Sequence, residues 1–164
     1  MAFYCVANKY GGKNPSLDVR SLCLIRETLA RFSGLADFVF AMQGLGSGTI
    51  SLFGSAELKK KYLPDVRRGN KIAAFALTEP DAGSDAAALT TTAEQDDTSF
   101  VLNGDKTLIS NGGIADYYTV FAKTGEAPGT RGISAFVIDA DTAGLEINER
   151  IEVIAPHPLA RIRF

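Results

Sequence analysis

The chain has 164 residues, of which 46% are hydrophobic and 22% are charged. This composition is typical of a folded globular protein and excludes a disordered one, and the length allows one compact body or two parts that share an interface. The formal net charge is −2, with 17 basic and 19 acidic residues, and the basic residues are scattered along the chain, so we expect no nucleic-acid partner.

The few cysteine and histidine residues exclude several kinds of site. Cys5 and Cys23 have no metal-ligand spacing, and His157 is the single histidine, so we expect no metal site and no disulfide framework. No apolar run reaches the roughly 18 residues that a membrane span needs, and the first residues lack the pattern of a signal peptide. We therefore expect a cytoplasmic protein without a membrane partner. His157 lies between two prolines, which favours a packing or solvent-facing role over a catalytic one.

The first part of the chain, residues 17–63, has helical periodicity. Ser33 and Gly34 interrupt the pattern and divide it into two helices. The apolar residues that recur at spacings of three and four are Leu22, Ile25, Leu29, Phe32 and Ala36 in the first helix, and Leu35, Phe38, Val39 and Met42 in the second.

A third helix is predicted in the stretch GSAELKKKYLP. Ser55 can cap its first turn, Glu57 suits the positive end of the helix dipole, and Pro64 should end it. Residues 59–61 are lysines that we expect on a solvated helix face. The glycine-rich stretch QGLGSGT, residues 43–49, does not follow a strand, so we interpret it as a connection between helices and not as a phosphate loop.

After Lys71 the pattern becomes that of short β-strands rich in Thr, Val, Ile, Phe and Tyr. Asn103 and Gly104 predict a tight hairpin between SFVL and DKTLIS. Few helix-length crossovers separate the runs, so we predict an α+β protein. A helical N-terminal segment, residues 1–70, is followed by a mostly antiparallel β-barrel or sandwich, residues 71–164.

A polar turn, TEPDAGSD, joins the helical and β parts. Pro80 ends the strand before it, Gly83 allows a ligand to approach the backbone closely, and Ser84 offers a hydroxyl group. Two readings follow from the residue types alone: a solvated surface turn, or a nest of N–H groups that binds a pyrophosphate.

Several separated segments closely resemble the acyl-CoA dehydrogenase family of flavoproteins, in the order in which the family has them. They are YGG, FGSAELKKKYLPDVRRGNKIAAFALTEP, FALTEPDAGSDAAAL, VLNGDKTLISNGGIADYYTVFAKT and GISAFVIDADTAGLEI. The resemblance runs from Tyr10 onward and covers the end of the family's N-terminal helical domain and its middle β-domain. It departs from the family at Leu108, where a tryptophan is usual, and before the last strand, where a Met-Gly-x-Arg stretch is absent.

The resemblance implies FAD as the cofactor and an acyl-CoA thioester as the substrate. One wall of the flavin site would come from the segment 75–84, with Leu77 and Thr78 at the polar edge of the ring and Gly83 and Ser84 at the pyrophosphate. The other wall would be the segment 107–110, whose Ser110 lies near flavin N5. Ser84 and Thr124 would contact the CoA part of the substrate. The cofactor-binding residues so implied are Phe75, Leu77, Thr78, Gly83, Ser84, Leu108, Ile109 and Ser110.

The implied reaction is the α,β-dehydrogenation of an acyl-CoA thioester, an oxidoreductase reaction of fatty acid metabolism. The family's catalytic base lies in a C-terminal helical domain, so we assign no catalytic residue here and reject Glu79 as a substitute. We expect this chain to be a fragment with little or no turnover by itself, homo-oligomeric as part of a full-length member, and self-associating when isolated, with an unknown electron acceptor. The alternatives are a flavin-dependent acyl-CoA oxidase or desulfinase, and a non-catalytic module that binds flavin or CoA.

Overall fold

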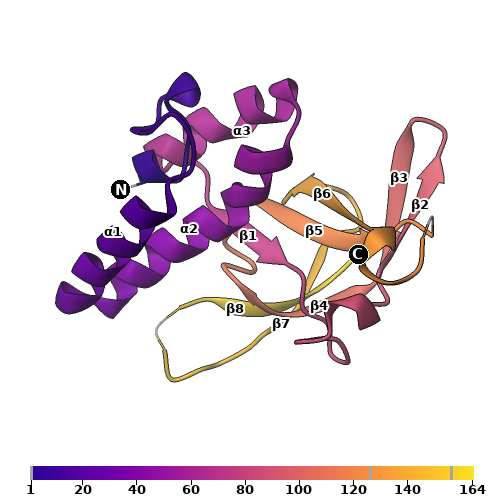
Figure 1. Ribbon diagram of the computed structural model, residues 1–164. Helices are drawn as coiled ribbons and strands as arrows, with labels where there is room; N and C mark the ends of the chain where they lie inside the picture. The colour runs from indigo at the N-terminus through magenta and orange to yellow at the C-terminus, as the bar shows by residue number, and fades with distance from the viewer. Residues whose placement is uncertain (1, 126, 156) are drawn as a thin grey trace. The chain divides into compact units, whose positions relative to one another are not determined.

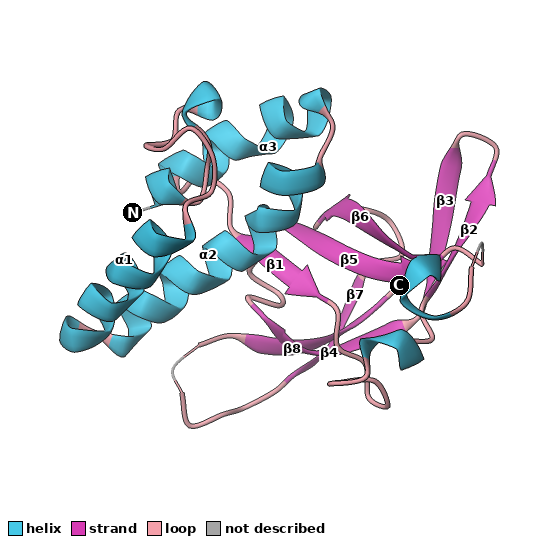
Figure 2. Ribbon diagram, in the orientation of Figure 1, coloured by secondary structure: helices cyan, strands magenta, loops and turns pink. Residues whose placement is uncertain are grey.

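The computed structural model describes residues 2–125, 127–155 and 157–164. Within them the chain forms three α-helices and then eight β-strands (Figures 1 and 2). Contacts divide the chain into a helical unit, Met1–Ala74, and a β unit, Phe75–Phe164. The predicted α+β class is confirmed. None of the helices in the described ranges is long and apolar enough to cross a membrane.

The helices of the first unit begin at polar capping residues. Asp18, Ser33 and Ser55 each accept a hydrogen bond from the backbone N–H three residues further along, which pairs a donor that the helix leaves free. The cap at Ser55 and the break at Ser33 were both predicted. The helices are α1 (Val19–Phe32), α2 (Gly34–Phe53) and α3 (Ala56–Arg68), and two short 3₁₀ turns, η1 (Ala2–Tyr4) and η2 (Asn8–Tyr10), precede them.

The glycine-rich stretch 43–49 lies inside α2, so its interpretation as a connection between helices is wrong. The side-chain amide of Gln43 donates to the Lys71 carbonyl (2.6 Å) and accepts from the Ala73 N–H (3.1 Å). A Cβ atom on Gly46 would come within 2.6 Å of the Ala73 Cβ atom. The glycine therefore allows the segment around Ala73 to lie directly against the helix.

Pro64 does not end α3, which continues to Arg68. Proline removes one N–H from the helical hydrogen bonds, and this costs about 3 kcal/mol in an exposed helix. Tyr62, Leu63 and Val66 are fully buried on either side of it. Their packing offsets the lost hydrogen bond, and Gly69, with a φ of 77°, ends the helix instead.

The β unit contains two sheets. One has the order β1-β5-β2-β3, with β6 also paired to β5, and the other has the order β4-β8-β7. The pairs β2–β3, β5–β6, β4–β8 and β7–β8 are antiparallel, whereas β2 and β5 are parallel. The arrangement is sandwich-like and not a closed barrel. The strands are β1 (Ala73–Ala76), β2 (Thr92–Asp96), β3 (Ser99–Asn103), β4 (Asp105–Ser110), β5 (Tyr117–Lys123), β6 (Ile133–Asp139), β7 (Glu146–Arg150) and β8 (Leu159–Arg163).

The hairpin predicted at Asn103 and Gly104 is wrong, because β3 pairs with β2 whereas β4 pairs with β8. The chain crosses from one sheet to the other at Gly104, which exchanges backbone hydrogen bonds with Phe164. A Cβ atom at Gly104 would come within 2.3 Å of the Thr91 hydroxyl oxygen, so glycine is needed for close packing. The actual hairpin joins β2 to β3 through Asp97, whose φ is 49°.

Candidate functional site

The two segments predicted to form the cofactor site lie next to one another in the β unit. Phe75 in β1 packs against the Phe121 ring, with ring centroids 4.9 Å apart. Beyond the strand, the Thr78 carbonyl accepts a hydrogen bond from the Thr107 N–H (2.9 Å). The end of the first segment is thereby tied to the beginning of the second.

An irregularity in β4 determines which side chains of the second segment face outward. The register with β8 shifts between Lys106 and Ile109, and Leu108 has a φ of 55°. Ile109 is buried, whereas Leu108 is 56% exposed. Ser110 is half-buried and pairs with Leu159 of β8. The bulge therefore presents an apolar side chain at the surface beside a hydroxyl group.

The turn after β1 is closed by its own backbone. The Glu79 N–H donates to the Ala82 carbonyl (3.0 Å), and the Ala82 N–H donates to the Glu79 carbonyl (3.2 Å). Gly83 and Ser84 follow and are exposed. No atom lies within 4 Å of the position that a Gly83 Cβ atom would take. A ligand can thus approach the backbone at Gly83 without displacing any part of the chain.

The two residues predicted to contact the CoA part of a substrate lead into neighbouring elements. Ser84 precedes the 3₁₀ turn η3 (Ala86–Ala88), which lies against the 3₁₀ turn η4 (Gly129–Gly132). Thr124 is joined to the end of η4, because its N–H donates to the Gly132 carbonyl (3.0 Å). The contact between η3 and η4 therefore places the segments that contain Ser84 and Thr124 near one another in the β unit.

A buried ion pair between Glu79 and Lys106 was not predicted. The Lys106 ammonium nitrogen lies 2.8 Å from a Glu79 carboxylate oxygen and 3.1 Å from the Leu77 carbonyl oxygen. The two side chains are 0% and 3% exposed. The Glu79 carboxylate also accepts hydrogen bonds from the backbone N–H and the hydroxyl group of both Thr90 and Thr91. Every charge in the cluster is compensated, which is the condition for burying an ion pair.

These hydrogen bonds determine the charge states of the pair. Burial alone would raise the pKa of the Glu79 carboxyl group, but the bonds from Lys106, Thr91 and Thr90 outweigh burial and lower that pKa to about 2. Burial lowers the pKa of the Lys106 ammonium group, and the hydrogen bond with Glu79 opposes this shift. Glu79 is therefore ionised at neutral pH, and a carboxylate with so low a pKa and with its oxygens engaged in hydrogen bonds is a poor general base.

The local sequence does not indicate this ion pair. In a regular strand Lys106 and Leu108 would lie on the same face, and only the register shift between Lys106 and Ile109 allows the first to be buried and the second exposed. Glu79 was interpreted only as part of a turn. Because 26 residues lie between the two, neither the spacing nor the local pattern connects them.

His157 is half-buried, and its imidazole Nδ1 lies 3.4 Å from the Pro158 carbonyl oxygen. The other flanking proline, Pro156, lies outside the described residues. Among the described residues there is no group of three potential metal ligands.

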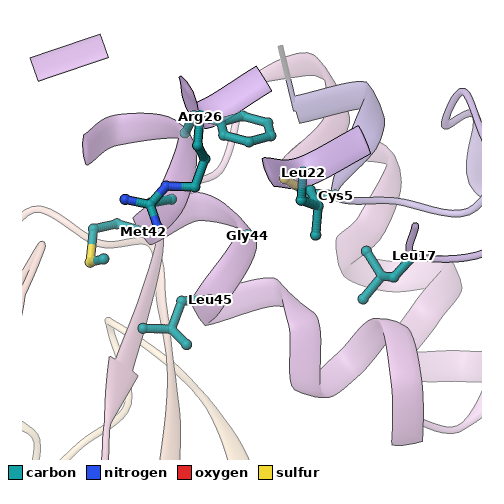
Figure 3. Close-up of a pocket in the computed structure, with 9 residues that line it drawn as sticks. Cys5, Leu17, Leu22, Arg26, Met42, Gly44 and Leu45 are labelled. Atoms are coloured by element: carbon teal, nitrogen blue, oxygen red, sulfur yellow. The ribbon is translucent and has the colours of Figure 1, made fainter. Parts of the chain in front are cut away.

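The helical unit contains an apolar pocket of about 320 Å³, lined by residues of α1, α2 and the segment before them (Figure 3). Arg26 lines the pocket, and its guanidinium group donates two hydrogen bonds of 2.9 Å to the Asp37 carboxylate. Burial raises the pKa of the Cys5 thiol to about 11, so this sulfur is not a nucleophile at neutral pH. The pocket is therefore lined by apolar side chains, an arginine that is paired with Asp37, and a thiol that is not ionised at neutral pH.

Comparison with protein families gives two adjoining matches. The model of the acyl-CoA dehydrogenase N-terminal domain matches residues 1–70, and the model of the acyl-CoA dehydrogenase middle domain matches residues 74–164. An acyl-CoA dehydrogenase of Bacillus subtilis is 39% identical over 146 residues, which are 88% of this chain and 38% of the relative.

Solved structures agree in fold. Butyryl-CoA dehydrogenase of Megasphaera elsdenii superposes with a TM-score of 0.90 at 33% identity, over 99% of this chain and 44% of that one. An acyl-CoA dehydrogenase of Bacillus anthracis complexed with FAD has a TM-score of 0.84 at 36% identity, over 99% of this chain and 28% of that one. The chain thus spans less than half the length of these relatives.

Proposed function

This chain belongs to the acyl-CoA dehydrogenase family, and on that premise we propose that it supplies the flavin-binding wall of an FAD-dependent dehydrogenase of acyl-CoA thioesters. The hydrogen bond between Thr107 and Thr78 is the observation that carries the proposal. It joins the two chain segments to which the resemblance assigns the flavin. The FAD complex of the Bacillus anthracis relative supports the choice of cofactor.

The residues of the two segments fit such a cofactor. We propose that Thr78 and Ser110 donate hydrogen bonds at the flavin ring, and that Leu108, which is exposed on the β4 bulge, covers the ring. The open space beside Gly83 suits a pyrophosphate, with Ser84 as a further donor. Phe75, Leu77 and Ile109 would support this surface from β1 and β4. FAD, when bound, supplies the acceptor for a hydride from the substrate.

The reaction proposed for the whole protein is α,β-dehydrogenation, in which a carboxylate removes the α-proton of the thioester. Glu79 is not that carboxylate, because its oxygens are taken up by Lys106, Thr90 and Thr91. We assign no catalytic residue to this chain. Ser84 and Thr124 are the proposed contacts to CoA, and their neighbouring turns η3 and η4 support a common contact surface.

The remaining features of the proposal come from the sequence and the family. We propose two domains, residues 1–70 and 71–164, a role in fatty acid metabolism, and assembly into a homo-oligomer. A cytoplasmic location stays a prediction. The electron acceptor is not assigned.

The test is a titration of the 164-residue chain with FAD, followed by flavin fluorescence. We expect saturable binding that Gly83→Asp weakens by about tenfold, because the added carboxylate would repel the negatively charged pyrophosphate beside it. The substitution meets no atom within 4 Å, so the fold should be retained. Ser84→Ala should weaken binding several-fold through loss of one hydrogen bond.

Gly34→Asp is the matched control. It also adds one carboxylate where no atom lies within 4 Å, but in the first turn of α2, where a negative charge suits the helix dipole. We expect this variant to bind FAD as the parent does. Equal losses in the two aspartate variants, or no saturable binding by the parent chain, would contradict the proposal.

A further inference from the structure

We propose that Lys106 is a positioning residue that orients the peptide group between Leu77 and Thr78, so that the Thr78 N–H is presented to the flavin ring. The proposal rests on the proposed function for the identity of the ring. The contact that carries it is the hydrogen bond from the Lys106 ammonium nitrogen to the Leu77 carbonyl oxygen (3.1 Å).

Because the peptide group is planar, the contact with the Leu77 carbonyl also determines the direction of the Thr78 N–H. The peptide groups of the described residues are trans, and in a planar trans peptide the C=O and the following N–H point in opposite directions. The Leu77 carbonyl points to Lys106, whose side chain is 0% exposed. The Thr78 N–H therefore points away from the buried cluster, on a residue that is itself only half-buried.

The next peptide group is held in the same way. The Thr78 carbonyl accepts from the Thr107 N–H (2.9 Å), and the Glu79 N–H donates to the Ala82 carbonyl (3.0 Å). Lys106 and Thr107 are neighbours in β4, so one strand holds two successive carbonyl groups of the segment after β1. The backbone at Thr78 is thus fixed on both sides by β4.

A contribution to stability alone does not account for a lysine at this position. Replacing a buried ion pair by apolar residues of similar volume is often neutral or stabilising. An apolar side chain at position 106 would fill the space but could not donate to the Leu77 carbonyl. Glu79 compensates the charge of the ammonium group, which allows such a donor to be buried.

The experiment compares variants that remove the Leu77 contact with one that disturbs the same cluster and spares it. Lys106→Met removes the contact, and the double variant Lys106→Met with Glu79→Gln does so without leaving a carboxylate buried and uncompensated. Thr91→Val is the matched control, because it removes a hydroxyl donor to Glu79 and leaves Lys106 and Leu77 in place. All four proteins are studied as the 164-residue chain.

Three quantities are measured: the Thr78 amide signal and its hydrogen-exchange rate by NMR without cofactor, the affinity for FAD, and the visible circular dichroism of the bound flavin. In both variants that lack Lys106 we expect a changed Thr78 amide signal, a changed dichroism band and roughly tenfold weaker FAD binding, as for the loss of one hydrogen bond. Thr91→Val should lower the stability of the chain and leave these three quantities as in the parent.

The inference would be overturned by a Thr78 amide signal and exchange rate that are unchanged without Lys106. It would also be overturned if FAD affinity fell in Thr91→Val as much as in the double variant. Failure of the parent to bind FAD would count against the proposed function, and the Thr78 amide comparison, which needs no cofactor, would then decide the role of Lys106 by itself.

Discussion

At the scale of single residues, the Glu79 carboxyl group links the stability of the chain to pH. Its pKa is about 2 in the folded chain and 4.5 in a free side chain, so the folded state favours the ionised form. This stabilisation is fully present above pH 4.5 and is lost as the pH falls toward 2. The difference corresponds to a contribution on the order of 3 kcal/mol.

We therefore expect the free energy of unfolding, measured with urea at pH 5, 4 and 3, to fall more steeply for the parent than for Glu79→Gln. Other carboxylates titrate in both proteins, so the difference between the two curves reports Glu79 together with its ion-pair partner Lys106. Parallel curves would show that Glu79 titrates alike in the folded and unfolded chains.

At the scale of elements, α2 contains two glycines with opposite expected responses to alanine. In a helix interior, Gly→Ala usually stabilises by about 1 kcal/mol. Gly48→Ala should do so, since no atom lies within 4 Å of its added Cβ, whereas a Cβ on Gly46 would lie 2.6 Å from the Ala73 Cβ and 3.0 Å from backbone atoms. We expect Gly46→Ala to destabilise by about 1–3 kcal/mol. Urea unfolding of both variants tests this, and stabilisation by both would contradict the packing at Gly46.

At the scale of the whole molecule, large apolar side chains are exposed on α1 and α2. Phe32 is 86% exposed and Phe53 is 83% exposed, and a net charge of −2 gives little repulsion between copies. We expect the apparent mass of the isolated chain, measured by light scattering, to rise with concentration. Phe53→Glu should reduce this rise, whereas Thr98→Glu, which adds the same charge in an exposed turn of the β unit, should reduce it less. A monomer of constant mass across all concentrations would contradict the prediction.

Local signals predicted much of the fold, because the interactions that determine them lie within a few residues. The cap at Ser55 and the break at Ser33 follow from the side chains at those positions. The predicted change from helices to strands after Lys71 is found in the structure, where the first strand begins at Ala73. The resemblance also identified the two segments that the Thr78–Thr107 hydrogen bond joins.

Where the sequence predictions were wrong, a distant contact outweighed the local preference. Pro64 remains helical because Leu63 and Val66 are packed in the core, and Gly104 carries the chain between two sheets where local rules predict a hairpin.

The sequence by itself determined the family, the succession of helices and strands, and the segments proposed to bind the cofactor, because these depend on local order and local chemistry. Only the tertiary structure decided how the segments are held. Lys106 of β4 meets Leu77 and Glu79, which follow β1 in the other sheet, and such a meeting across more than 25 residues depends on how the two sheets pack, which no local pattern specifies.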